Sequence, residues 1–236
     1  MDFDIVRNRI SKWNPLNIRR KQKLRDRLTN HDMTILASNC IGGIVYSHLG
    51  VEFNSPTINL MIASNEFVKM CTNLEHYLSA KLLFAEDNNE VQYPIAKLDD
   101  ITVHFTHYST KEEAEFDWER RKKRIRTDNM FIMTNDRDGL TEEDILTLAK
   151  VQCRGVVVFT SREYRNIPCC LFIKKFQGRP CVGNVLKKNR CTGKRVYEEY
   201  FDYVSWFNNG DGNMDITPYK LKTDRGDKAE YESSCN

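Results

Sequence analysis

The sequence of 236 residues is long enough to bury one substantial core, and its 40% hydrophobic and 11% aromatic content excludes a disordered chain. Its 36 basic and 33 acidic residues leave a net charge of +3, which gives no general case for nucleic-acid binding. No apolar run approaches the ~20 residues that span a bilayer, and the N-terminus lacks the apolar segment of a secretory signal. We therefore expect a cytoplasmic protein that binds no nucleic acid.

The eight cysteines form no C-x-x-C pair, and several lie inside apolar segments, so we expect them to be reduced. Cys169, Cys170, Cys181 and Cys191 are close in sequence, but their spacings are too irregular for a zinc ribbon.

Residues 1–30 are strongly basic and are interrupted at Pro15. Their apolar residues recur at helical spacing, which predicts one or two amphipathic helices. Such a segment can contact a partner enzyme or the anionic inner face of a membrane, which would make the protein peripheral to it. The alternative is a helix packed on the following domain with its charges in solvent.

Residues 31–207 alternate between apolar strands and helices, beginning with an apolar run at residues 33–37. Ser38-Asn39-Cys40-Ile41-Gly42-Gly43 follows and predicts a tight turn into a helix N-terminus. The helix dipole, free N–H groups and paired glycines at such a turn favour an anion, so Ser38, Asn39, Cys40, Gly42 and Gly43 are candidate ligands of a phosphorylated small molecule or sugar. The alternative is a packing turn that needs glycine. Cys40 is also a candidate nucleophile, because a helix N-terminus can lower the pKa of a thiol, although the sequence assigns it no histidine partner.

A second short strand is predicted at residues 58–62, followed by a helix over 64–78, a hairpin of residues 82–85 and 93–98, and a strand over 100–108. His107 lies at the end of that last strand and is a candidate general base. Ser109 or Thr110 should cap the next helix, which carries Arg121 near its end. Arg121 is a candidate for binding a diphosphate or sugar acid, with Trp118 available for stacking. A solvated basic face is the alternative.

The next apolar strand, residues 130–134, runs into Asn135-Asp136-Arg137-Asp138-Gly139. Asp136 and Asp138 resemble the carboxylate pair with which many nucleotide-sugar transferases hold Mg²⁺ or Mn²⁺. An Asx turn followed by glycine explains the same residues without a metal. Thr141 and Asp144 predict a capping box, and a further strand over 155–160 ends before Arg162.

These elements predict an α/β fold in a single main domain, with helices on both faces of a sheet that is largely parallel, or mixed. Ligands of such sheets bind beyond the carboxyl ends of the strands. The residues expected to line one cleft there are Asn39, Gly42, Gly43, His107, Asn135, Asp136 and Arg162. An aromatic-rich helix is expected over 195–207, and the polar residues 208–236 predict a flexible tail.

Several ordered blocks resemble a known family. They include the SNCIGGIVYSHLG run from Ser38, Ser55-Pro56-Thr57-Ile58-Asn59-Leu60, Tyr93-Pro94-Ile95-Ala96-Lys97-Leu98, His104-Phe105-Thr106-His107-Tyr108 and Asn135-Asp136-Arg137-Asp138-Gly139. Together they are similar, over about residues 30–175, to the bacterial domain-of-unknown-function family "nineteen-nineteen". Its members are often labelled exopolysaccharide biosynthesis proteins. The resemblance implies an α/β domain associated with capsule or exopolysaccharide synthesis, and it supplies no catalytic residues.

Two classes of function follow. The first is a transferase that uses a nucleotide-sugar or another phosphorylated donor, with His107 as base and Asp136 and Asp138 holding a metal or an acceptor hydroxyl. The second is a non-catalytic binding or scaffold protein of the same pathway that docks through its basic segments. A hydrolase or acyltransferase that uses Cys40 is the third interpretation.

Overall fold

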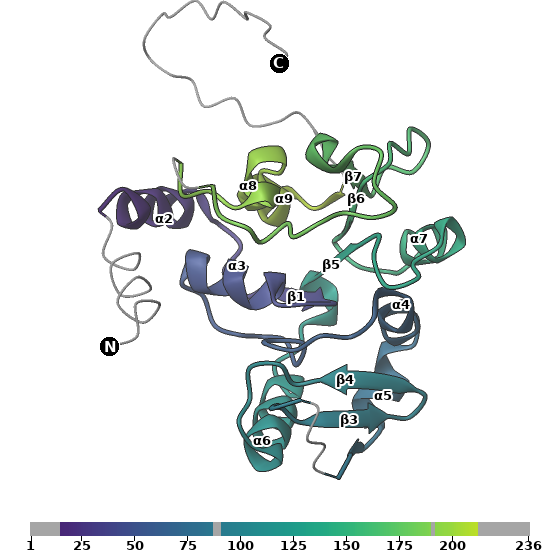
Figure 1. Cartoon of the computed structure of the whole chain (residues 1–236). Helices are drawn as coiled ribbons and strands as arrows, with labels where there is room; N and C mark the ends of the chain where they lie inside the picture. Colours follow the sequence, from purple (N-terminus) through teal and green to yellow (C-terminus); the bar gives the residue numbers. More distant parts are fainter. Residues whose placement is uncertain (1–14, 87–90, 190–191, 212–236) are drawn as a thin grey trace, which may run out of the picture.

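The computed structural model describes residues 15–86, 91–189 and 192–211 of the chain. The elements, drawn in Figure 1, are in chain order α2 (Pro15–Arg27), β1 (Thr34–Ala37), α3 (Ile41–Leu49), α4 (Ser64–Thr72), α5 (Leu74–Ser79), β2 (Leu82–Phe84), β3 (Ile95–Leu98), β4 (Ile101–His104), α6 (Lys111–Lys122), η1 (Thr127–Asn129), β5 (Met130–Asn135), α7 (Glu142–Leu148), β6 (Gly155–Thr160), β7 (Cys170–Phe172), η2 (Lys174–Phe176), α8 (Val196–Tyr200) and α9 (Tyr203–Asn209).

Four strands form one parallel sheet in the order β1-β5-β6-β7. Along the first pair, Thr34 lies beside Met130 and Ala37 beside Met133. The pairs β5–β6 and β6–β7 are parallel as well. The predicted class is therefore confirmed: the protein is α/β, and helices cover both faces of a parallel sheet.

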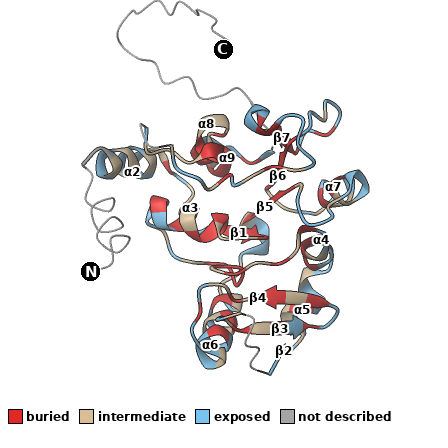
Figure 2. Cartoon of the chain, viewed as in Figure 1, coloured by how far each residue is buried: buried red, intermediate tan, exposed pale blue. Residues whose placement is uncertain are grey.

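Successive side chains of the parallel strands enter opposite cores, as the period of two in a strand requires. Ile35 of β1 packs in the core under α3, α8 and α9, whereas its neighbour Leu36 packs in the core with α4, α6 and α7. Phe131 and Ile132 of β5 divide in the same way. Every residue of β1, β5 and β6 is buried, which explains why these strands are almost continuously apolar in sequence (Figure 2).

β1 is an edge strand, and side chains close its outer side. The Ile35 N–H donates to the Tyr46 hydroxyl at 2.8 Å, and that hydroxyl donates to the Met33 carbonyl at 3.0 Å. The Ala37 N–H donates to Thr57 Oγ1 at 2.9 Å. These bonds satisfy backbone groups that would otherwise invite another strand.

A second sheet of three antiparallel strands, β2-β3-β4, lies in the long connection between β1 and β5. It contains the predicted hairpin. The strand predicted over 100–108 is shorter, since β4 ends at His104, and it belongs to this small sheet. The strand predicted over 58–62 is wrong: Met61 makes only an isolated bridge to His104, with two backbone hydrogen bonds of 2.8 Å.

The helix starts predicted at Thr110 and Thr141 are confirmed. Thr110 Oγ1 accepts from the Glu113 N–H at 3.2 Å, and Thr141 forms a capping box with Asp144. The predicted helix over 64–78 is two helices, because Asn73 leaves helical geometry, with φ −134° and ψ 51°. The helix predicted over 195–207 is likewise divided, at the extended residue Phe201.

The predicted basic segment and the predicted tail are described only in part. Residues 1–14 and 212–236 lie outside the described residues. α2 packs on α3, and Arg25 Nε donates to the His48 carbonyl at 3.1 Å. At the other end, the Trp206 indole donates to Asp211 Oδ1 at 2.7 Å.

Candidate active site

The ends of three parallel strands meet at one edge of the main sheet. Ala37 lies beside Met133, and Asn135 lies beside Phe159. The ends of β1, β5 and β6 and the segments that follow them therefore lie together. Asn135 is the last residue of β5, and Asn39 and Arg162 follow β1 and β6. This edge is where ligands bind in parallel α/β sheets.

His107 reaches the same edge from a different sheet. Its Nε2 lies 3.2 Å from Cys40 Sγ, which is close enough for a hydrogen bond between imidazole and thiol. Thr106 Oγ1 is 4.0 Å from the same sulfur. Cys40 is half-buried and His107 is exposed, so the pair is accessible from solvent. A candidate nucleophile and a candidate base are thus in contact at the end of β1.

Two buried aromatic residues hold the turn that presents His107. Phe105 and Tyr108 are 1% and 7% exposed, and their rings meet edge to face at 5.5 Å between centroids. The Arg121 guanidinium donates to the Tyr108 hydroxyl and pairs with Asp117 at 2.5 Å. Thr106 and His107 lie between these two anchors and point towards Cys40. The turn is therefore fixed from within the core.

Cys40 is the residue from which α3 starts. Asn39 Oδ1 accepts from the Ile41 N–H at 3.0 Å and so satisfies one N–H of the first helical turn. Burial raises the pKa of the Cys40 thiol, and the smaller opposing effects of Thr106 and of its own backbone N–H do not cancel this. The thiol is therefore protonated at neutral pH, and it needs a base to become a nucleophile.

The paired glycines are explained by close packing. A Cβ on Gly42 would lie 3.1 Å from the Ala37 Cβ, and one on Gly43 would lie 2.9 Å from Asn59 Oδ1. Both glycines are buried. These contacts support the packing-turn interpretation, and an anion site at Gly42 and Gly43 stays a prediction.

Ser38 lies deeper than an anion ligand should. It is 2% exposed, and its Oγ accepts from Thr134 Oγ1 at 2.9 Å. Thr134 Oγ1 also lies 3.4 Å from Ser64 Oγ. These three buried hydroxyls join β1, β5 and the start of α4, so the geometry gives Ser38 a structural role.

Asp136 receives three hydrogen bonds. Its Oδ2 accepts from the Ser161 N–H at 2.6 Å and from the Ser161 hydroxyl at 2.8 Å, and its Oδ1 accepts from the Val182 N–H at 2.7 Å. Both carboxylate oxygens thus join the ends of β5 and β6 to the later segment around Val182.

Asp138 is exposed in a turn, with φ 54°, and Gly139 follows at φ 78°. This agrees with the turn interpretation of the Asp-x-Asp-Gly sequence. Within the described ranges, no group of three or more His, Cys, Asp or Glu side chains could hold a metal ion. Binding of Mg²⁺ or Mn²⁺ by Asp136 and Asp138 stays a prediction.

The remaining predicted ligands differ in accessibility. Arg162 is exposed beyond β6, and the Asn135 side chain accepts from the Arg137 N–H at 3.1 Å. Arg121 is only 5% exposed, and its contacts with Asp117 and Tyr108 place it behind His107. The stacking role predicted for Trp118 is wrong, because that side chain is 1% exposed in the core beside Phe105.

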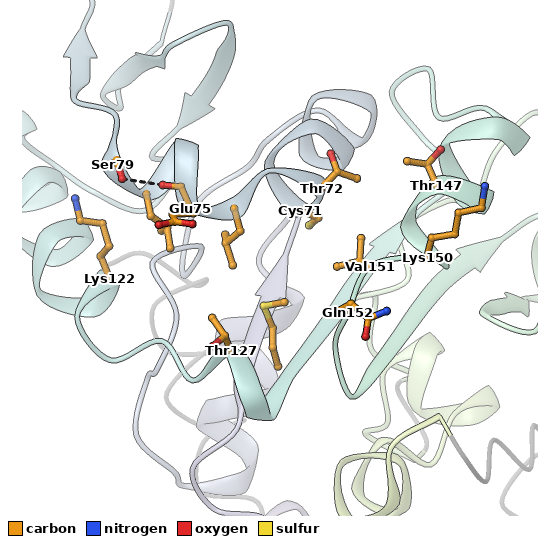
Figure 3. A pocket seen from close by; sticks show the side chains of 13 residues that line it. Cys71, Thr72, Glu75, Ser79, Lys122, Thr127, Thr147, Lys150, Val151 and Gln152 are labelled. Atoms are coloured by element: carbon orange, nitrogen blue, oxygen red, sulfur yellow. Dashed lines mark hydrogen bonds between the residues drawn. The ribbon is translucent and has the colours of Figure 1, made fainter.

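A cavity of about 920 Å³ lies elsewhere, near the start of β5 (Figure 3). Its lining includes the buried residues Cys71 and Met130 and the side chains of Lys122 and Lys150. None of the predicted site residues lines it. The site residues were predicted from the carboxyl ends of the strands, whereas this cavity lies near the amino end of β5.

The contact between Cys40 and His107 is what sequence reasoning missed. The residues are 67 positions apart, and both were placed at a strand end on separate grounds. The only signal was that strand ends of an α/β sheet converge. Nothing in the sequence indicated that a small second sheet would bring the imidazole to the thiol.

The fold and this site define the class of protein: a helix-covered parallel α/β protein with a thiol–imidazole pair at the strand ends. The chain belongs to the family described as Domain of unknown function (DUF1919), whose sequence pattern matches residues 12–208. It is 35% identical over 206 residues to an uncharacterized protein from Haemophilus influenzae (strain Rd), an alignment that covers 87% of this chain and 98% of that protein. The family predicted from the sequence blocks is therefore confirmed.

Neither the family description nor the relative's name refers to exopolysaccharides, so that association stays a prediction. In the part of the chain that the structure describes, no helix combines the length and apolar character needed to cross a bilayer.

Proposed function

We propose that this protein is an enzyme that uses Cys40 as nucleophile and His107 as general base to transfer or hydrolyse an acyl group. The observation that carries the proposal is the 3.2 Å contact between Cys40 Sγ and His107 Nε2 at the strand edge. The thiol lies at a helix N-terminus, whose partial positive charge favours the negative charge that develops during attack.

The reaction begins when His107 Nε2 accepts the thiol proton and Cys40 Sγ attacks the acyl carbonyl carbon. The bond to the leaving group breaks, the leaving group takes the proton from the imidazolium, and a thioester remains on Cys40. A water or acceptor hydroxyl then attacks the thioester while His107 accepts its proton. The S–C bond breaks, and the proton returns to the sulfur.

The first test measures acylation of Cys40 by p-nitrophenyl acetate in the full chain, by mass spectrometry of the peptide that contains Cys40. We expect His107→Ala to slow acylation of Cys40 at least tenfold near neutral pH, because a protonated thiol without a base reacts poorly. His76→Ala is the matched control, since His76 is also exposed but pairs with Asp99 at 2.7 Å. Equal rates of Cys40 acylation in the two variants would overturn the proposal.

A sugar-donor transferase of exopolysaccharide or capsule synthesis is the second candidate. It is favoured by the convergence of Asn39, Asn135 and Arg162 at the edge where phosphorylated ligands bind in such sheets. It shares His107 as the base and differs in needing no covalent thioester.

This second candidate predicts that a nucleotide-sugar with Mn²⁺ raises the melting temperature. At a hundred times the dissociation constant, a ligand stabilises by about 2.7 kcal/mol, which is a readily measured shift. The shift should persist in Cys40→Ser and decrease in Arg162→Gln. A screen of nucleotide-sugars that gives no shift, with or without Mn²⁺, would remove this candidate.

A further inference from the structure

Cationic side chains from two distant segments meet beside the C-terminal end of α3. Arg20 of α2 places Nη1 2.6 Å from Glu198 Oε1 and Nη2 3.4 Å from the Gly193 carbonyl. The Arg195 N–H donates to Glu198 Oε2 at 2.6 Å. Lys188 forms an isolated antiparallel bridge with Arg195, so their side chains are neighbours. We call Arg20, Lys21, Lys188 and Arg195 the cationic cluster.

The cationic cluster carries an excess of positive charge. Of the carboxylates in the described ranges, only Glu198 forms an ion pair with a side chain of the cluster, that of Arg20, whereas the Arg195 guanidinium donates to the Leu186 carbonyl. Burial lowers the pKa of Lys21, and the positive charges of Arg25, Lys188, Arg20 and Arg195 lower it further. Partial burial and the positive charges of Arg195 and Arg20 also lower the pKa of Lys188, whereas the negative charge of Glu198 raises it. Four cations beside one carboxylate repel one another, and an added anion would relieve that repulsion.

Buried polar atoms without a hydrogen-bond partner are concentrated at the same place. Of the eight such side-chain atoms in the described part of the chain, five surround Glu198: Arg20 Nε, His48 Nδ1, Arg195 Nε, Tyr197 OH and Tyr203 OH. His48, Tyr197 and Tyr203 are at most 5% exposed. His48 Nδ1 lies 3.6 Å from Glu198 Oε1, which is longer than a normal hydrogen bond but close enough to lower the pKa of Glu198. Native structures normally satisfy such atoms through protein groups, ordered water or a ligand, and their concentration here is consistent with an additional polar ligand.

We propose that the cationic cluster binds a phosphoryl group. Guanidinium groups match the geometry of phosphate oxygens, and the lysines add charge. The site is separate from Cys40, because His48 lies near the C-terminal end of α3 and Cys40 lies at its start. Two sources share this chemistry: a soluble phosphorylated ligand and the headgroup of an anionic phospholipid.

The experiment measures the melting temperature of the full chain in sodium pyrophosphate against sodium chloride of equal ionic strength. We expect a saturable rise of about 5 °C at a hundredfold excess over the dissociation constant. The double variant Lys21→Gln, Lys188→Gln should lose most of this rise. Neither lysine side chain has a hydrogen bond to any residue in the described ranges, so this variant is expected to fold. Lys23→Gln, Lys187→Gln is the matched control, because both of its lysines are exposed neighbours of the cluster.

A second arm identifies the source of the phosphoryl group by co-sedimentation with vesicles of phosphatidylcholine with or without phosphatidylglycerol. Binding that needs phosphatidylglycerol and is lost in the Lys21/Lys188 variant assigns the cluster to a lipid headgroup. A pyrophosphate shift without vesicle binding assigns it to a soluble ligand. The proposal is overturned if neither is seen, or if the Lys21/Lys188 variant responds as strongly as the Lys23/Lys187 control.

Discussion

Near pH 7, the substitution Glu198→Gln is expected to lower the free energy of unfolding by about 3 kcal/mol. The Glu198 side chain is 5% exposed and accepts hydrogen bonds from Arg20 Nη1 and the Arg195 N–H, both at 2.6 Å. Burial raises the pKa of Glu198, but His48, the Arg195 N–H and Arg20 together outweigh burial and lower it to about 2. A depression from 4.5 to about 2 is equivalent to about 3 kcal/mol of stability.

The pH dependence follows from the direction of this shift. The folded state favours the ionised form of Glu198 more than the unfolded state does. The contribution of Glu198 to the free energy of unfolding is therefore complete above about pH 4.5. It is lost as the pH falls from there towards about 2. Urea unfolding of wild type and Glu198→Gln should therefore differ most near neutral pH and converge in acid. Glu163→Gln is the control, since Glu163 is exposed and only weakly paired with Arg165. An equal difference between wild type and Glu198→Gln at all pH values would contradict this account.

The substitution Asp136→Asn is also expected to cost about 3 kcal/mol of stability. A carboxylate can accept from all three donors that Ser161 and Val182 present, whereas a carboxamide has one oxygen and places an NH₂ against an N–H. Ser161 and Val182 are both 1% exposed, so their N–H groups would lose an acceptor away from water. Hydrogen bonds to a charged acceptor contribute about 1.5–3 kcal/mol each and are not additive.

The matched control is Asp138→Asn, at an exposed position where we expect a change within about 0.5 kcal/mol. Urea unfolding of both variants gives the comparison. If the only role of Asp136 is to bind a metal ion, then Asp136→Asn will unfold at the same urea concentration as wild type. It will lose only the Mn²⁺-dependent rise in melting temperature. That result would restore the metal interpretation of the Asp-x-Asp sequence.

The architecture was predictable because the strands that decide it are buried on both faces. Such strands are almost continuously apolar, and they alternate with capped helices such as the one that begins after Thr141. The short segment around Met61 was not predictable in this way. This segment is equally apolar, but only Met61 pairs with another strand, through its bridge to His104. How many residues of a segment pair depends on the strand that lies opposite, which the segment's own sequence does not determine.

The candidate site was predictable in position but not in its contacts. The rule that strand ends converge placed Asn39, Asn135 and Asp136 at one edge. The Asp136 carboxylate accepts from the backbone N–H of Val182, which lies 46 residues later, and this contact decides whether the carboxylate is available to a ligand. The contact between Cys40 and His107 depends on Phe105 and Tyr108, whose packing is a property of the folded core. Residue type and spacing carry no information about such long-range contacts.

The pairing of β1 with β5 has a consequence for folding. Ser38, which follows β1, and Thr134 of β5 are 96 residues apart in sequence. On a ribosome that adds about 5–20 residues per second, β1 waits roughly 5–20 seconds for its partner. During that time the apolar edge of β1 depends on local partners such as Tyr46 and Thr57. Closing so long a loop is slow, so we expect the strands β5, β6 and β7, which are near in sequence, to pair before β1 is added.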